Sequence, residues 1–370
     1  MRPAAAEVSS AAVEPFLLAD DLPHRVVLVN GRWSPSMSSL ASLPAGVSVR
    51  SLREVLDSSS SMRGVLAETP SHTPFVDLNT AFVEDGVVID VAPKAVIDEP
   101  LHIVCLTVPG AEPAMICPRI VVVAGERSQM FLVESYAGSA DGVTLTNAVT
   151  QVHVGVEANV DHAKFQREQR STFHMAATFA RVERAGRFTS HAVTLGGMIA
   201  RNDIVATLAG EAAECTLDGL YVADGDSLVD THTTIDHAMP HQPSHELYKG
   251  ILAGRARAVF NGKIIVRQDA QKTNAKQTNK ALLLTDEAQI NTKPQLEIFA
   301  DDVKCTHGAA IGQLDEDALF YMQARGISAA DARNLMIHAF AGEVLDGVRE
   351  DVVREQAMRL LEEKLSLWQV

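Results

Sequence analysis

One short stretch of the chain combines a thiol with an imidazole, two side chains that readily bind soft metal ions. In the sequence K-C-T-H-G-A, Cys305 is followed two residues later by His307. On an extended strand these side chains point to the same face, about 6.6 Å apart along the backbone. The sulfur and a ring nitrogen can then reach a single metal ion.

This pair alone does not complete a metal site. Zinc and iron-sulfur centres usually need more protein ligands than one thiol and one imidazole, and no Cys-x-x-Cys or His-x3-His pattern lies nearby. We therefore expect a second chain to complete any site formed by Cys305 and His307. The alternative is structural, because free cysteines are commonly small hydrophobic side chains. Cys305 would then be a buried thiol and His307 a hydrogen-bonded histidine at a strand end.

A second group of candidate ligands lies between Asp224 and His245. It holds four histidines within 14 residues and two acidic partners, namely His232, His237, His241, His245, Asp230 and Asp236. Imidazole is the commonest metal ligand, but Pro240 and Pro243 prevent one helix from aligning the four. Stacked polar side chains and turn hydrogen bonds explain these residues as well, and we favour that interpretation over a metal site.

The segments that carry these residues are mostly short strands. From about residue 87 to residue 309, β-branched runs alternate with Gly, Asp and Asn, which indicates a mainly β domain. Four glycine-led turns recur before alternating apolar positions, with spacings of 30, 31 and 24 residues, at Gly125, Gly155, Gly186 and Gly210. A period of this size predicts a stacked solenoid, in which each coil buries its apolar face on the next.

Mixed and helical segments flank the predicted β domain. Before it, an Ala-rich start and a Ser-rich stretch surround a strand at 26–29, a tight turn at Asn30-Gly31 and a short helix at 77–82. After Gly312 helices take over, with Asp315 and Ser328 as N-terminal caps and Gly326 as a stop. The predicted divisions are a mixed, partly helical region at 1–90, a β core at 91–311 and a helical domain at 312–370.

Composition excludes several classes of function. The chain has 370 residues, 46% of them hydrophobic, and a net charge of −15. An acidic chain repels nucleic acid and anionic membrane surfaces, so neither is an expected partner. The four cysteines are far apart, as in reduced cytosolic proteins, and no signal peptide or long apolar run is apparent. We therefore expect a cytoplasmic protein, with Cys105 and Cys215 in its core.

The chain shows no ATP-binding motif. The nearest candidate, F-N-G-K-I at 260–264, lacks the first glycine and the final hydroxyl of the phosphate-binding loop. Any ATP hydrolysis must then come from a partner. No flavin site is assigned from the sequence.

The sequence around Cys305 is similar to a known protein family. The stretches that carry the likeness are N-T-K-P-Q-L-E-I-F-A-D-D-V-K-C-T-H-G-A at 291–309, G-Q-L-D-E-D-A-L-F-Y at 312–321, E-L-Y-K-G-I-L from 246 and R-A-V-F-N-G-K-I from 257. They resemble the SufB/SufD family, and within it the SufD form, the non-ATPase partner in the SufBCD iron-sulfur assembly complex. The match is dense from about 217 to 347 and thin before residue 100.

The resemblance implies a fold, partners and a site. It implies a right-handed parallel β-helix that acts as a non-catalytic scaffold, forms a homodimer when isolated, and pairs with SufB. It places Cys305 and His307 at the SufB contact, where an iron-sulfur cluster is transiently held or built. It also implies that the ATPase SufC docks on the C-terminal helices. An apolar stripe at helical spacing fits such a docking face, although packing on the β domain explains it equally: Leu335, Met336, Ala339, Phe340 and Leu345.

Three other functions are weighed against this one. A SufB-type main scaffold is disfavoured by the short chain and by the SufD form of K-C-T-H-G-A. A carbohydrate-active β-solenoid enzyme needs converging carboxylates, and the 5% aromatic content makes sugar stacking improbable. A metal-free structural dimer is the third, and copurification with SufB and SufC would separate it from the first.

Overall fold

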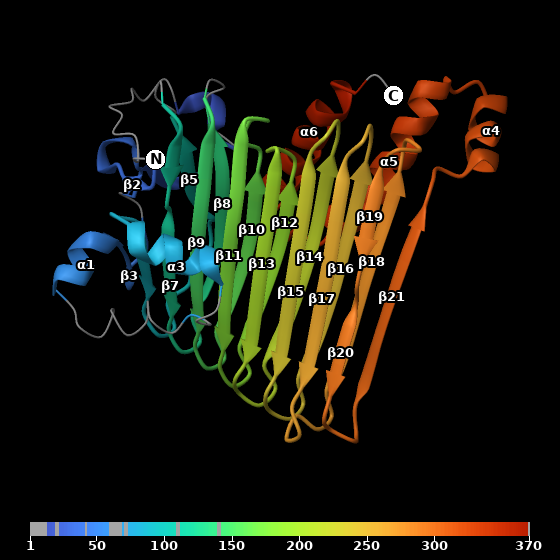
Figure 1. Ribbon diagram of the computed structural model, residues 1–370. Coiled ribbons are helices and arrows are strands. Elements are labelled where there is room, and N and C mark those ends of the chain that lie inside the picture. The colour runs from blue at the N-terminus through green and yellow to red at the C-terminus, as the bar shows by residue number, and fades with distance from the viewer. Residues whose placement is uncertain are drawn as a thin grey trace.

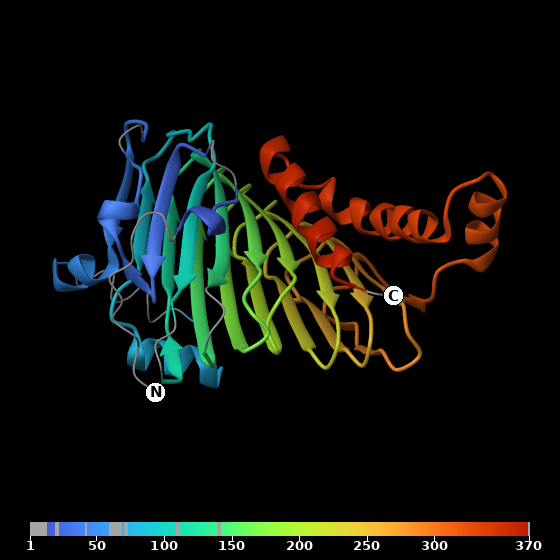
Figure 2. The same cartoon turned by 90° about the horizontal axis from the view of Figure 1, so that it is seen from above.

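The computed structural model describes residues 13–18, 22–40, 43–58, 69, 73–108, 112–138 and 142–368. The Ala-rich start and part of the Ser-rich stretch of the predicted N-terminal region, at 41–42, 59–68 and 70–72, lie outside these residues. Two long sheets face each other and run the length of the molecule, and helices lie at its two ends (Figures 1 and 2). Within the described part of the chain, no helix combines the length and apolar character needed to cross a bilayer.

Sheet A has ten strands in the spatial order β2-β1-β5-β8-β10-β12-β14-β16-β18-β21. All neighbours are parallel except β1 and β2. The strands are β1 His24–Val29, β2 Arg32–Trp33, β5 Leu101–Thr107, β8 Gln129–Gly138, β10 Asn159–Gln166, β12 Arg187–Thr194, β14 Glu214–Ala223, β16 Pro243–Leu252, β18 Asn274–Leu283 and β21 Lys304–Gly312.

Sheet B has eleven strands and is likewise parallel except where β3 meets β4. Its main order is β19-β17-β15-β13-β11-β9-β7-β4-β3, with β20 beside β17 and β6 beside β9. The strands are β3 Val47–Ser51, β4 Val87–Val91, β6 Ala114–Ile116, β7 Arg119–Ala124, β9 Thr144–Val154, β11 Thr172–Val182, β13 Ile199–Leu208, β15 Leu228–His237, β17 Arg257–Val266, β19 Gln289–Thr292 and β20 Gln295–Ile298.

The chain alternates between the two sheets, so most coils contribute one strand to each, and two coils give sheet B two short strands. The result is a β-solenoid of about 8 turns, which confirms the predicted stacked architecture. The predicted turn glycines lie where the chain leaves sheet B for sheet A. A Cβ added at Gly155 would lie 2.7 Å from the Ala124 carbonyl oxygen of the preceding coil. The coils stack so closely at this corner that a side chain there does not fit.

Strands from the N-terminal region join both sheets. β1 pairs with β5 and β4 with β7, so the first coils are built partly from residues before 91. The predicted turn at Asn30-Gly31 joins β1 to β2, with φ values of 50° and 80° that suit a tight hairpin. Two short helices lie beside sheet B, α1 Leu52–Ser58 and α3 Pro74–Phe82. The predicted boundary at residue 90 remains a prediction.

Three helices follow the last strand: α4 Glu316–Ala324, α5 Ala329–Leu345 and α6 Asp351–Ser366. Both predicted caps are present. The Asp315 side chain accepts hydrogen bonds from the backbone of Asp317 and Ala318, and Ser328 accepts one from Asp331. α5 and α6 pack on the outer face of sheet A, where Val344 and Leu345 meet its apolar residues, while α4 extends beyond the sheet (Figure 2).

Candidate functional site

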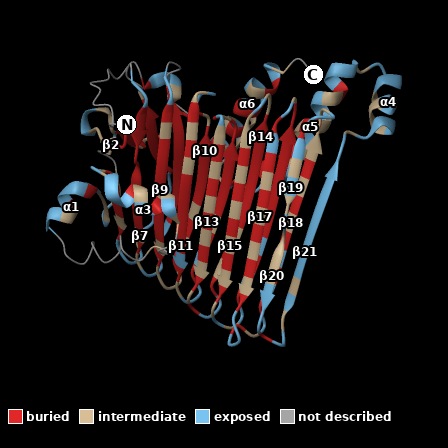
Figure 3. Cartoon of the chain, in the orientation of Figure 1, coloured by how far each residue is buried: buried red, intermediate tan, exposed pale blue. Residues whose placement is uncertain are grey.

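The last strand of sheet A forms an open edge. β21 pairs with β18 on one side and ends the strand order on the other. Eight of its nine residues are exposed and the ninth is half-buried, in contrast to the buried strands behind it (Figure 3). A strand with unpaired backbone groups is a ready surface for pairing with another chain.

Cys305 and His307 both lie on this edge strand. The register places Cys305 opposite Ala275 and His307 opposite Gln277 of β18. Cys305 is half-buried and packs against the cluster that includes Ile264 and Val266, so it faces the interior of the solenoid. His307, two residues later, lies on the same face and is exposed. The structure therefore brings the two residues to one face of the open end.

Burial of Cys305 favours the protonated form of its thiol. Burial raises the pKa of Cys305, although a backbone hydrogen bond at Ala275 opposes the shift. Because metals bind the thiolate, coordination here must release a proton. Among residues with described positions, no three or more His, Cys, Asp or Glu side chains are grouped to hold a metal ion. A metal ion held by Cys305 and His307 would therefore need further ligands from outside the described residues.

The predicted docking stripe does not form one surface. Leu345 is fully buried against sheet A and belongs to the packing of α5 on the solenoid. Its side chain is therefore not accessible to a docking partner. Met336 and Phe340 are half-buried and Ala339 is exposed, as is Leu335 at 53%. The Lys249 amino group lies 4.5 Å from the centre of the Phe340 ring, so part of that side chain is engaged within the molecule.

Two aromatic residues of α4 were not predicted as part of this surface. Phe320 is 73% exposed and Tyr321 is 58% exposed, on a helix that extends beyond the edge of sheet A. The exposure of both rings could have been predicted from the sequence. L-F-Y lies in a capped helix of only 9 residues, which has little surface on which to bury both rings.

Two family models match this chain. The family described as "SUF system FeS cluster assembly, SufBD core domain" matches residues 106–340, and "SufBD protein N-terminal region" matches residues 21–103. The chain belongs to the SufBD family.

Curated relatives come from bacteria and plants. A SufBD family protein for iron-sulfur cluster assembly from Synechocystis is 36% identical over 91% of this chain and 77% of its own length. Escherichia coli SufD is 33% identical over 65% of this chain and 57% of its own length. The chloroplastic protein ABCI7 of Arabidopsis thaliana is 36% identical over 65% of this chain and 51% of its own length. The match thus spans little more than half of the latter two relatives.

The four histidines between 232 and 245 are dispersed in this SufBD chain. His232 Nε2 lies 2.9 Å from Asp230 Oδ1, and buried His237 has its Nε2 3.0 Å from Ser244 Oγ. His241 occupies a turn with φ of 61°, and His245 Nδ1 lies 3.7 Å from Asp218 Oδ1. Their separate partners agree with the favoured reading of stacked polar side chains and turn hydrogen bonds.

Other residues singled out from the sequence lie within the fold. Cys105 and Cys215 are buried in the main apolar core, as predicted. The stretch F-N-G-K-I falls inside strand β17, where its backbone pairs with neighbouring strands instead of forming a loop.

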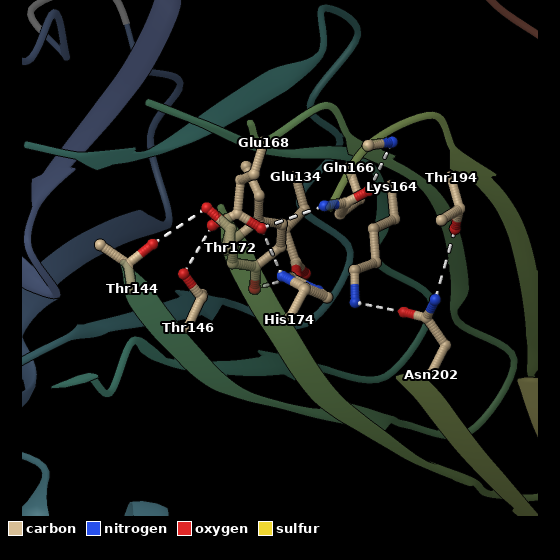
Figure 4. A network of polar contacts seen from close by, with 12 residues as sticks. Glu134, Thr144, Thr146, Lys164, Gln166, Glu168, Thr172, His174, Thr194 and Asn202 are labelled. Atoms are coloured by element: carbon tan, nitrogen blue, oxygen red, sulfur yellow. Dashed lines mark hydrogen bonds and ion pairs between the residues drawn. The ribbon is translucent and has the colours of Figure 1, made fainter. Parts of the chain in front are cut away.

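The interior of this SufBD solenoid contains a polar network that was not predicted (Figure 4). Its buried members include Glu134, Tyr136, Thr146, Thr150, His162, Lys164, Gln166, Glu168, His174 and Asn202. Lys164 Nζ donates to Asn202 Oδ1 at 3.0 Å. Burial alone would raise the pKa of Glu134, but His162 and Lys164 beside it hold that pKa at about 2. Charged residues at inward-facing strand positions were the signal for this network.

Proposed function

We propose that this chain is a SufD-type scaffold subunit of a cytoplasmic SufBCD machinery for iron-sulfur cluster assembly, with no catalytic reaction of its own. The observation that carries the proposal is the open strand β21, which presents Cys305 and His307 on one face. The 33% identity to Escherichia coli SufD supports the SufD assignment. In this reading the iron-sulfur cluster is cargo and no resident cofactor is required.

The edge of β21 pairs with SufB in this proposal. Strand addition would satisfy the free backbone groups of β21 and continue sheet A into the second chain. Cys305 and His307 would then lie at the seam, and SufB would supply the missing ligands. In the isolated protein a second copy takes the place of SufB, which gives a homodimer through the same edge.

The ATPase SufC docks on the C-terminal helices in this proposal. The exposed apolar residues Phe320, Tyr321 and Leu335 give the face for it on α4 and α5. Large exposed aromatic and aliphatic side chains of this kind are typical of protein interaction sites. ATP hydrolysis then enters through SufC, which accords with a chain that lacks a phosphate-binding loop.

The test is cluster assembly on the coexpressed complex. His307→Ala, coexpressed with SufB and SufC, is expected to keep the complex intact by size exclusion but to lose most bound iron and sulfide under anaerobic analysis. Thr306→Ala is the matched control, because Thr306 is exposed on the same strand and points to the opposite face. Normal iron and sulfide in both His307→Ala and Cys305→Ala would overturn the proposed site.

A further inference from the structure

Glu246, Gln277 and His307 form a row of register partners that runs from the solenoid interior to the open edge. Glu246 of β16 is the register partner of Gln277 of β18, and Gln277 is the register partner of His307 of β21. Neighbouring parallel strands lie about 4.8 Å apart, so each of these side chains stacks on its register partner in the next coil. Glu246 and Gln277 are buried, at 0% and 1% exposure.

The Gln277 amide is held in one orientation. Gln277 Nε2 donates to Glu246 Oε2 at 2.7 Å, and Thr233 Oγ1 donates to Glu246 Oε1 at 2.5 Å. Across the interior, Gly262 of β17 leaves the space that the amide occupies, since a Cβ there would lie 2.3 Å from Gln277 Nε2. With its nitrogen committed to Glu246, the amide is left with its oxygen as a free acceptor.

That oxygen has no partner among the described residues. Gln277 Oε1 is a buried acceptor without a hydrogen bond, and buried polar groups of this kind normally have one. The next coil presents the His307 imidazole in register on the same face. Asn279 also has an unpartnered oxygen, but its register partner is Ala309, whose side chain cannot donate.

We propose that Gln277 is the positioning residue for His307, accepting a hydrogen bond from one ring nitrogen and leaving the other nitrogen as the free ligand atom at the seam. This inference rests on the proposed role of His307. Metal-binding histidines commonly donate their second ring N–H to such an acceptor, which fixes both the tautomer and the ring plane. Glu246 and Gly262 act indirectly: Glu246 accepts a hydrogen bond from the Gln277 amide, and Gly262 leaves the space that the amide occupies.

The first test reads the tautomer of His307 in the full-length chain. Ring-¹⁵N-labelled histidine is incorporated, and the His307 signals among the 13 histidines are assigned with His307→Ala. At pH 8.5 one tautomer is expected in the wild type, and a mixture is expected in Gln277→Leu. Asn279→Leu is the matched control, because it removes a neighbouring buried amide and should keep the single tautomer.

The outcomes decide the inference in either direction. If His307 keeps its single tautomer in Gln277→Leu, the inference is overturned. It is also overturned if Asn279→Leu gives the same tautomer mixture as Gln277→Leu, because both substitutions would then disturb the edge in general. Thermal unfolding of both variants confirms that each is folded when the spectra are recorded. If Gln277→Leu unfolds, Gly262→Ala displaces the same amide without removing it. It should also give a tautomer mixture, and an unchanged tautomer there would overturn the inference.

The second test separates this inference from the proposed function. In the coexpressed complex, Gln277→Leu is expected to lower bound iron and sulfide about tenfold or more, as loss of such supporting hydrogen bonds typically does. If His307→Ala and Cys305→Ala both leave bound iron and sulfide normal while the tautomer still depends on Gln277, the proposed site fails and the positioning contact stands. If His307→Ala abolishes iron and Gln277→Leu does not, the positioning role fails alone.

Discussion

At the residue scale, Cys305 and His307 depend on neighbours that lie far away in the sequence. The alternation of side chains along a strand was enough to predict that the two residues share a face. The residues behind them, Gln277 and Glu246, precede His307 by about one and two solenoid coils and meet it only through stacking. Residues that become neighbours in this way carry no local signal, which is why the sequence did not show them.

Glu246 gives a prediction for stability against pH. Burial raises the pKa of Glu246 to about 7 from an ordinary value of 4.5, despite the hydrogen bonds from Thr233 and Gln277. Between these two values the folded chain keeps a proton that the unfolded chain has lost, so the free energy of unfolding falls as pH rises through this window. Above pH 7 the buried Glu246 is ionised, and the free energy of unfolding is then lower by the full amount of about 3 kcal/mol.

Glu246→Gln removes this titration. In urea unfolding, the stability of the variant relative to wild type should improve by about 3 kcal/mol between pH 4 and pH 8. The comparison with wild type cancels the other carboxylates, which titrate in both proteins. A difference between the two proteins that stays constant with pH would contradict the assignment.

At the element scale, the coil corners and the helix caps were the parts that sequence predicted best. Turn glycines and capping residues act through their own backbone and their near neighbours, so their signals are local. The face of α5 was predicted less well. Leu345 and Leu335 both lie on the predicted apolar stripe, but only Leu345 is buried, because the angle at which α5 meets sheet A decides which residues are covered.

Gly155→Ala tests the close stacking of the corners. The added methyl group would lie 2.7 Å from the Ala124 carbonyl oxygen, so the two coils must separate. We expect a loss of about 1–3 kcal/mol in the free energy of unfolding, as for other overpacked positions. Gly308→Ala is the control, since apart from its two chain neighbours no residue has an atom within 4 Å of its added Cβ. Equal effects of the two substitutions would contradict the stacking argument.

The proposed SufC docking face gives a prediction at the same scale. Phe320→Ser combined with Leu335→Ser should weaken SufC binding at least tenfold in a calorimetric titration, because buried aromatic and aliphatic anchors dominate protein interfaces. Leu367→Ser is the control, since Leu367 is 77% exposed but follows α6 instead of lying on α4 or α5. SufC binding that is unaffected by the double change would place the docking face elsewhere.

At the scale of the whole molecule, the solenoid followed from a repeat, but its polar interior did not. The spacing of glycines predicted stacked coils, and the β-branched runs predicted strands. Glu134 and Lys164 are register partners on adjacent coils, so they support each other only after the coils stack. The joining of β1 to sheet A was also missed, because pairing between distant strands leaves no periodic signal.

Lys164→Met tests the interior network. It removes the buried cation beside Glu134 and leaves Asn202 without its donor, with an expected loss of about 3–5 kcal/mol in urea unfolding. Adding Glu134→Gln should restore part of the loss, because the carboxylate that has lost the Lys164 charge is then gone. Lys272→Met is the surface control, an exposed ion-pair residue whose removal should cost less than about 1 kcal/mol. If the double variant is as unstable as Lys164→Met alone, Lys164 and Glu134 are not energetically coupled.

We propose that β21 is the strand by which this SufBD chain joins a second subunit. Hydrogen exchange of residues 304–312 measures it directly, comparing the chain at a dilution where it is monomeric with the chain in complex with SufB. Slow exchange of the outward-facing β21 amides is expected only in the complex, with little change at β2 on the opposite edge of sheet A. Fast exchange of β21 in an intact complex, with protection appearing elsewhere, would contradict it.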